Sequence, residues 1–402
     1  RSVDEFKSEY IRKIVQYCPP MFHDRMKRIK TTDDEHITLS YLTTGSSTLL
    51  QNQAEYHSVS NFCCNERTEW QDMTIADTHA FGRALYTDNC LQSAECDERI
   101  YHEMLIHTPC AIHGNVKRVL IGGAGEGATL RELLRYSNIE EIVTVDIDEA
   151  AIKLNMKHLR TWNQDLWHHD KVTVIFDDIN NVFKKYENYF DLVILDLSDP
   201  TERYGPAASL YTDEFYQSGL NTLREGGLLA MQSGEISQHC DHCSSVAATM
   251  KSVATWVDHY RLKIHSFGME WLVTLASQKK YDINPKNLET FYKSIGEDSC
   301  GFKLDYYNPK THVDAFIFSK RMQNIIDRPA AITSASILKR LTNAVSLINT
   351  SNTEKTLTID EMLYEFKHAR MVINNGYMIQ DFARFFSHEL PKKALNFCKK
   401  YG

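Results

Sequence analysis

Residues 120–132, LIGGAGEGATLRE, decide the fold. An apolar run ends there in alternating small residues, and glycines at such a turn let a ligand approach the backbone closely. The loop reads G-x-G-x-G over Gly123, Gly125 and Gly127, not the G-x-G-x-x-G of pyrophosphate-binding loops. Glu126 stands among these glycines. Because its carboxylate would repel a phosphate, the loop predicts a ligand that needs no phosphate cradle.

Apolar runs recur beyond this loop, separated by stretches of helical periodicity. The segments VKRVLIG, EIVTVDI, KVTVIF, DLVILDL and GLLAMQS are typical of strands in a parallel, doubly wound sheet. YRLKIHSF and EWLVTLAS predict a closing hairpin. The fold class is therefore α/β, with a Rossmann-like domain over residues 111–285.

The flanking segments follow other patterns. Residues 1–50 form an N-terminal extension for which the pattern specifies no structure. Residues 51–110 carry short alternating runs typical of an antiparallel β-meander domain, then a helix, DERIYHEMLIHTP, that we expect to end at Pro109. Residues 286–402 predict a mixed, mostly helical C-terminal extension, in which YYNPKTHVDAFIFSK is a candidate further strand.

The composition narrows the class of protein. Of 402 residues, 43% are hydrophobic and 24% charged, as in ordinary soluble globular proteins. No apolar run of spanning length and no leader pattern is found, so neither a membrane span nor a signal peptide is indicated. Ten scattered cysteines suit reduced thiols in a cytoplasmic protein. A net charge of −8 argues against a nucleic-acid partner and suits a cationic small molecule.

The segment QHCDHC has the appearance of a metal-binding knuckle. It carries His239, Cys240, His242 and Cys243. Structural zinc needs four ligands, usually as two separated pairs, and no second cysteine pair stands at suitable spacing. A polar turn before a helix is the favoured interpretation, with zinc as the alternative, and we expect no metal site.

Acidic residues follow three successive strands. Glu126 lies in the glycine loop, and Asp146 ends the next strand, where its side chain can accept hydrogen bonds from both ribose hydroxyls. Asp178 follows the third strand and can receive the exocyclic amine of an adenine. Each residue taken alone is more often a helix cap. Together they favour a sulfonium nucleoside, S-adenosylmethionine or its decarboxylated form, over NAD.

The fourth strand ends in DLSDP, which places Asp196 and Asp199 beside the glycine loop. One carboxylate can accept a proton from an ammonium group while the other holds a more distant positive charge. A free amine with a pKa near about 10 is mostly protonated at neutral pH, so it needs a base before it can attack carbon. The alternative is a capped loop leading to a helix near Tyr211, for which Ser198 and Pro200 would suffice.

These motifs together resemble the polyamine aminopropyltransferases, the family of the spermidine, spermine and thermospermine synthases. The resemblance rests on GGAGEGATLRE, VDIDEA, DLSDP…GPAASLYTDEFY and DERIYHEML, and covers residues 51–278. It implies a small N-terminal β-domain before a Rossmann-like domain of the methyltransferase type. It also implies transfer of an aminopropyl group from decarboxylated S-adenosylmethionine to an amine, with release of methylthioadenosine.

The resemblance implies roles for individual residues. Glu126 would pair with the aminopropyl ammonium of the donor, and glutamate at this position is similar to the thermospermine and triamine-type enzymes. Asp146 would hold the ribose and Asp178 the adenine amine. Asp196 would be the base, and Asp199 would bind the acceptor. The remaining matched positions are Gly123, Gly125, Gln71 and Gln92 for the donor, and Tyr101 and His102 for the acceptor.

Two departures from the family pattern leave the acceptor amine open. Trp70 replaces a tyrosine, and Phe267 and Glu270 stand where a late tyrosine is expected. One alternative function is an S-adenosylmethionine-dependent amine N-methyltransferase on the same scaffold. The other is a non-catalytic relative whose C-terminal helices bind a partner. The retained acidic residues argue against this second alternative. We expect a cytoplasmic homo-oligomer, a dimer or tetramer, with no membrane partner.

Overall fold

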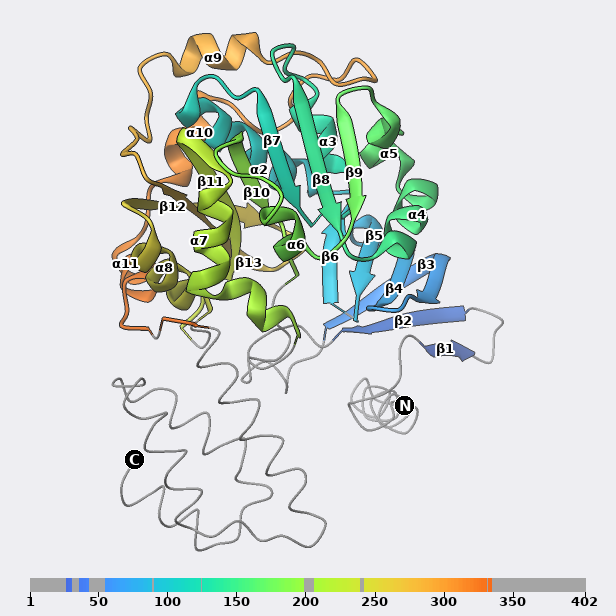
Figure 1. The fold of residues 1–402 in the computed structure, drawn as a ribbon. Coiled ribbons are helices and arrows are strands. Elements are labelled where there is room, and N and C mark those ends of the chain that lie inside the picture. The colour runs from blue at the N-terminus through green and yellow to red at the C-terminus, as the bar shows by residue number, and fades with distance from the viewer. Residues whose placement is uncertain are drawn as a thin grey trace, which may run out of the picture. The chain divides into compact units, whose positions relative to one another are not determined.

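The structure of the protein is a computed structural model (Figure 1). Among the described residues, one compact unit ends at Cys96 and a second begins at Asp97. Each unit is built on its own sheet. The structure describes residues 27–30, 36–42, 55–88, 90–123, 125–198, 206–238, 242–330 and 332–334.

The first unit is an antiparallel sheet whose strands follow one another in chain order. The strands are β1 (Lys27–Lys30), β2 (His36–Leu42), β3 (Glu55–Arg67), β4 (Asp72–Thr78), β5 (Gly82–Thr87) and β6 (Cys90–Ala94). The predicted meander is confirmed in β3 to β6. Ala84 and Tyr86 lie two residues apart on β5 and therefore on the same face of the sheet. There they pack with Ala94 of β6, which gives the sheet a small core. β1 and β2 extend it into the part of the chain predicted as an extension.

The second unit contains a seven-stranded sheet in the order β12-β13-β11-β10-β7-β8-β9. Its strands are β7 (Arg118–Gly122), β8 (Glu141–Asp146), β9 (Val172–Phe176), β10 (Phe190–Leu195), β11 (Leu223–Glu235), β12 (Trp256–Ile264) and β13 (Met269–Ser277). β7 to β11 are parallel, and β12 and β13 form the closing antiparallel hairpin. Both predictions are confirmed. The chain reverses its direction of travel across the sheet between β7 and β10, which makes their carboxyl ends the topological switch point.

Helices cover both faces of this sheet (Figure 1). They are α2 (Glu98–His113), α3 (Ala128–Leu133), α4 (Glu149–His158), α5 (Arg160–Asn163), η2 (Leu166–His168), α6 (Ile179–Phe183), η3 (Pro206–Tyr211), α7 (Asp213–Asn221) and α8 (His242–Val253). Side chains alternate along β7, so that Val119 and Ile121 join one buried cluster with Met104 and Leu130 from α2 and α3. Leu120 joins a second cluster with α6, α7 and α8.

The prediction that α2 ends at Pro109 is wrong. The helix continues to His113 and ends at Gly114, whose φ of 83° suits glycine and whose N–H donates to Cys110 O at 2.9 Å. Proline lacks an N–H but permits the helix to continue where burial stabilises the following turn, and Cys110 and Ile112 are buried in the core. α2 also belongs to the second unit, whereas the sequence boundary at residue 110 grouped it with the meander.

The described part of the C-terminal extension contains short helices joined by irregular segments. It contains α9 (Leu288–Ser294), α10 (Pro309–Ala315) and α11 (Lys320–Ile326). The candidate strand YYNPKTHVDAFIFSK is wrong, because α10 lies within it. Asn308 caps this helix in a capping box with Thr311, and Pro309 occupies its first turn. Residues 335–402, to which the helical prediction also extends, lie outside the described residues.

The QHCDHC segment leads into α8, which begins at His242. Cys243 is buried against Leu272 and Ile326, while His239 and Cys240 lie outside the described residues. Among the residues that the structure describes, no three histidine, cysteine or acidic side chains are grouped for a metal ion. In the same part of the chain, no helix is long and apolar enough to span a bilayer.

Candidate active site

The loops after β7 and β10 meet at the switch point. The N–H of Asp196 donates to Gly122 O at 2.8 Å, and a Cβ added to Gly123 would lie 2.1 Å from the carbonyl oxygen of Asp196. Only glycine therefore permits this approach. Gly127 precedes α3 with a φ of 83°, in the left-handed region that favours glycine. The glycines thus bring Glu126 and Asp196 into neighbouring loops.

The acidic residues after β8 and β9 differ in their contacts. Asp146 accepts hydrogen bonds from the N–H groups of Asp148, at 2.9 Å, and Gly125, at 3.4 Å. It therefore ties its own loop to the glycine loop, while Asp148 caps α4. Asp178 caps α6, and its Oδ1 accepts from both the backbone and the side chain of Asn180. The cap interpretation thus describes Asp178, and Asp146 has a different local role.

Tyr101 of α2 meets Asp196. Its hydroxyl donates to Asp196 Oδ1 at 2.5 Å. The ring centroid of Phe267 lies 6.4 Å from that of Tyr101 and 5.0 Å from that of Trp271. These rings come from α2 and from the β12–β13 hairpin. A half-buried carboxylate beside aromatic rings suits an aliphatic chain that carries a positive charge.

The loop after β10 is held by neutral hydrogen bonds. Gln232 of β11 donates from Nε2 to Leu197 O at 2.5 Å, and its Oε1 accepts from Trp271 Nε1 at 3.0 Å. The hydroxyl of Tyr211 donates to Ser198 O at 3.0 Å. Sequence reasoning missed Gln232. The available signal was a single amide in the apolar run GLLAMQS, where burial requires hydrogen-bond partners.

Glu126 is buried in a row of charges of alternating sign. His102 Nε2 lies 3.3 Å from Glu126 Oε1, and His102 Nδ1 faces Glu98 O at 2.7 Å and Glu98 Oε2 at 3.1 Å. Arg131 of α3 donates to both carboxylate oxygens of Glu98, at 2.9 and 2.8 Å. Burial acts to lower the pKa of His102, but the adjacent carboxylates of Glu126 and Glu98 outweigh it and raise that pKa to about 10.

Known proteins of one family resemble this chain. The family model described as the spermine/spermidine synthase domain matches residues 98–287. The polyamine aminopropyltransferase of Thermoanaerobacter pseudethanolicus is 33% identical over 263 residues, which are 65% of this chain and 90% of that protein. The chain belongs to the polyamine aminopropyltransferase family. Thermospermine synthase ACAULIS5 of Arabidopsis thaliana is 34% identical over 270 residues, 66% of this chain and 78% of that protein.

Solved structures of aminopropyltransferases share the fold. A spermidine synthase in complex with the transition state analogue AdoDATO matches with a TM-score of 0.64 at 22% identity, over 76% of this chain and 98% of that one. Spermidine synthase from Thermotoga maritima matches with a TM-score of 0.63, also at 22% identity, over 76% and 97%. The α/β architecture predicted from the sequence is confirmed.

The row of alternating charges that begins at Glu126 continues beyond Arg131, away from the glycine loop. Arg131 Nε lies 2.7 Å from Glu132 Oε1, and Glu132 Oε2 lies 2.6 Å from Arg135 Nε. Burial acts to raise the pKa of Glu132, but His107 and the two arginines hold it far below its usual value. Arg135 in turn lies 3.5 Å from Asp298. The row therefore links α2 and α3 to the C-terminal extension.

Glu103, to which the sequence assigned no role, anchors the same extension. Its carboxylate accepts three backbone N–H groups, from Asp305, Tyr306 and Tyr307, each at 2.8 Å. Burial raises the pKa of Glu103. The available sequence signal was a helical segment, DERIYHEMLIHTP, in which titratable residues alternate with apolar ones.

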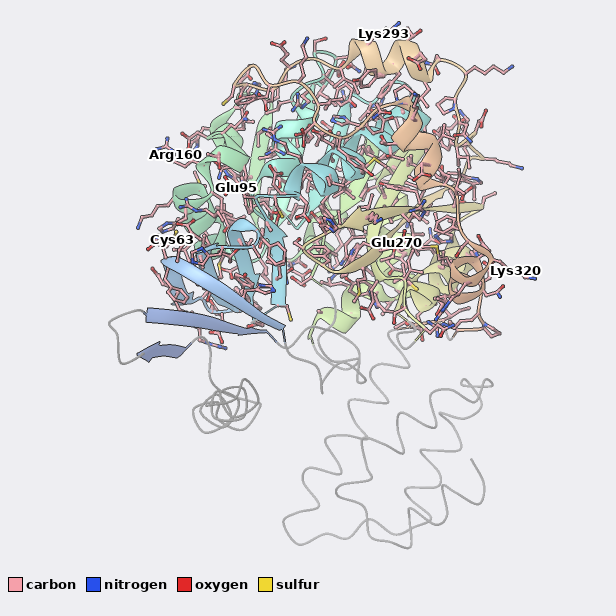
Figure 2. All side chains as sticks on the ribbon, turned by 180° about the vertical axis from the view of Figure 1, so that it is seen from behind. Cys63, Glu95, Arg160, Glu270, Lys293 and Lys320 are labelled. Atoms are coloured by element: carbon pink, nitrogen blue, oxygen red, sulfur yellow. The ribbon has the colours of Figure 1, made fainter. Side chains whose placement is uncertain are left out.

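Phe267 and Glu270, which depart from the family pattern, have different contacts. Phe267 lies in the aromatic group with Tyr101, whereas Glu270 of β13, labelled in Figure 2, pairs with Arg261 at 2.8 Å. Arg261 also contacts Asp314 at 3.0 Å. The carboxylate of Glu270 is therefore part of a pairing between the hairpin and α10.

Three predicted site residues belong to the first unit or lie outside the described residues. Gln71 and Gln92 belong to the first unit, as does the exposed Trp70. There the Gln71 N–H donates to Thr68 Oγ1 at 3.0 Å. Asp199 lies outside the described residues. The roles of Gln71, Gln92 and Asp199 stay predictions.

Proposed function

We propose that this chain transfers an aminopropyl group from decarboxylated S-adenosylmethionine to a small cationic amine, with Asp196 as the general base. The observation that carries the proposal is the approach of two carboxylate-bearing loops. Asp196 N–H bonds to Gly122 O, directly before the loop that holds Glu126. One cation site for the donor and one base for the acceptor would then lie in neighbouring loops at the switch point, where ligands of such sheets bind.

The donor would be held by its two ends. Asp146 would accept hydrogen bonds from the ribose hydroxyls, and Asp178 from the adenine amine. Glu126 would pair with the ammonium at the end of the aminopropyl chain. Because the glycine loop carries a carboxylate, a donor with no phosphate and no carboxylate at its chain end suits it best. The spermidine synthase solved with AdoDATO supports a donor of this type.

The acceptor reaction would be an in-line displacement. The acceptor arrives as an ammonium, and Asp196 takes one proton from it, which frees the nitrogen lone pair. That lone pair attacks the methylene carbon next to the sulfonium as the carbon–sulfur bond breaks. The bonding electrons stay on sulfur and leave methylthioadenosine as a neutral thioether. Orientation by Tyr101 and the neighbouring carboxylates would supply much of the acceleration.

Product analysis tests the proposal. The protein is incubated with decarboxylated S-adenosylmethionine or with the parent cofactor, each with a panel of diamines, triamines and monoamines. We expect methylthioadenosine, and only from the decarboxylated donor with an amine present. Release of S-adenosylhomocysteine would instead make the protein an amine N-methyltransferase. No turnover with any donor and amine would favour a non-catalytic relative.

A further inference from the structure

His102 has no hydrogen-bond donor left for a ligand. The side chain is 2% exposed, and an imidazole has only two ring nitrogens. Nδ1 faces two oxygens of Glu98, and Nε2 faces Glu126 Oε1. Carboxylate and carbonyl oxygens accept only, so both nitrogens must carry protons for both contacts to attract. The ring geometry therefore describes an imidazolium between two carboxylates.

The charged and titratable groups around His102 come from three segments. Glu98 and Tyr101 lie on α2, and the ring centroid of Tyr101 is 5.2 Å from that of His102. Glu126 comes from the glycine loop, and Arg131 of α3 faces Glu98 from its other side. Burial acts to raise the pKa of Glu98, but its bonds to His102 and Arg131 hold it below its usual value. The two carboxylates and two cations thus compensate one another.

We propose that His102 is a positioning residue: as an imidazolium held by Glu98, it fixes the carboxylate of Glu126 that would pair with the ammonium of the donor. This inference rests on the proposed function of Glu126 and departs from the expectation that His102 contacts the acceptor. Glu98 acts on Glu126 indirectly, because its negative charge keeps the imidazole ring of His102 protonated.

Loss of the ring proton would reverse the contact with Glu126. A neutral ring would keep its proton on Nδ1, where Glu98 O lies at 2.7 Å. Nε2 would then direct a lone pair at Glu126 Oε1, and two acceptors 3.3 Å apart repel each other. Glu126 would move from its position, and the affinity for the donor would fall.

The test is the pH dependence of donor affinity. Calorimetry between pH 7 and 9 with decarboxylated S-adenosylmethionine compares the wild type, Glu98→Gln and Glu98→Gln/His102→Gln. In Glu98→Gln the ring loses one carboxylate partner and titrates at lower pH. We expect its donor affinity to fall about tenfold over this range beyond any change in the wild type, as for the loss of one charged hydrogen bond. The double variant has no ring to titrate, so its profile should match that of the wild type.

Methylthioadenosine serves as the reference ligand because it lacks the aminopropyl group. Its affinity should not depend on pH in any variant, which also shows that each variant is folded. Donor affinity that rises with pH in Glu98→Gln would mean that a neutral His102 binds the ammonium itself. That result, or a profile as in the wild type, would overturn the proposal.

A second measurement needs neither the donor nor the variant Glu98→Gln. In ¹⁵N-histidine NMR of the wild type, assigned with His102→Gln, both ring nitrogens of His102 should show imidazolium shifts at pH 8. Neutral-ring shifts would overturn the inference even if the protein binds the donor. If the protein instead binds methylthioadenosine but not the donor while His102 is an imidazolium, the proposed function fails and the state of the ring stands.

Discussion

Glu126 and Asp196 follow neighbouring strands, yet their surroundings differ. Glu126 is 8% exposed, and His102 belongs to a row of charged partners beside it. Asp196 is half-buried and accepts from the neutral phenol of Tyr101, in a loop that Gln232 holds by neutral hydrogen bonds. A carboxylate that only binds a cation gains from fixed charges around it. As the proposed base, Asp196 would change its charge in each cycle, and the neutral phenol of Tyr101 is not left as a stranded counter-charge when it does.

The largest effect is expected at Asp196, the carboxylate with the neutral partner Tyr101. Asp196→Asn should lower turnover by about 100-fold or more, because a positioned base contributes roughly 100- to 10,000-fold. Donor affinity should change little, since the proposed partner of the donor's charged end is Glu126. Steady-state kinetics and calorimetry measure the two effects. The matched control is Asp170→Asn, an exposed carboxylate that should keep its turnover. Near-wild-type turnover in Asp196→Asn would remove this residue from the mechanism.

Glu126, beside the charged row, should instead control the preference between the decarboxylated donor and the parent cofactor. The parent cofactor carries a carboxylate at its chain end, and two like charges about 4 Å apart cost roughly 4 kcal/mol at an effective dielectric constant of 20. Half of that corresponds to a preference of about 30-fold for the decarboxylated donor. Glu126→Gln should shrink this preference. Calorimetry with both donors measures it, with the exposed Glu149→Gln as control. Equal affinities in the wild type would refute this role of Glu126.

The sequence predicted most of the fold because its strands are short, apolar and bounded by turn residues. β7 to β11 and the β12–β13 hairpin follow from that pattern. The two wrong elements each involve a proline. Pro309 in a predicted strand is the first residue of a helix capped by Asn308, while Pro109 lies inside a helix whose last turn is stabilised by burial. Local pattern cannot weigh tertiary burial against the missing N–H.

The site was predictable only where a motif places residues on adjacent loops. Glu126, Asp146 and Asp196 follow β7, β8 and β10, which are neighbours in the sheet, so parallel topology brings them to one edge. The partners of Glu126 were not predictable in the same way. Glu98 and Arg131 are 33 positions apart, and their pairing depends on how α2 packs against α3. The spacing of Glu98 and His102 on one helix face was the available signal.

The buried charge row should also give stability a specific pH dependence. Folded His102 keeps its proton up to about pH 10, whereas the unfolded chain releases it near 6.5. Between these values the folded state binds one more proton, so this stabilisation is complete below pH 6.5 and lost as pH rises to about 10. The slope is at most about 1.4 kcal/mol per pH unit. Urea unfolding at pH 7, 8 and 9 should show the slope in the wild type and its loss in His102→Gln. Identical slopes would contradict it.

The smallest effect is expected at Gln232, which sharpens the comparison because its contacts are neutral. Gln232→Met keeps the volume of the side chain but removes its hydrogen bonds to Leu197 O and Trp271 Nε1. The loop after β10 should then hold Asp196 less precisely. A neutral hydrogen bond contributes about 1 kcal/mol net, so kcat should fall roughly fivefold. Donor affinity should stay near that of the wild type, since Glu126 is held by other residues. The control is Gln217→Met on α7, whose side chain is half-buried and bonds to Asn221 at 2.9 Å. If Gln232→Met weakens donor binding as much as it lowers kcat, the two loops are held as one unit and the contrast between them fails.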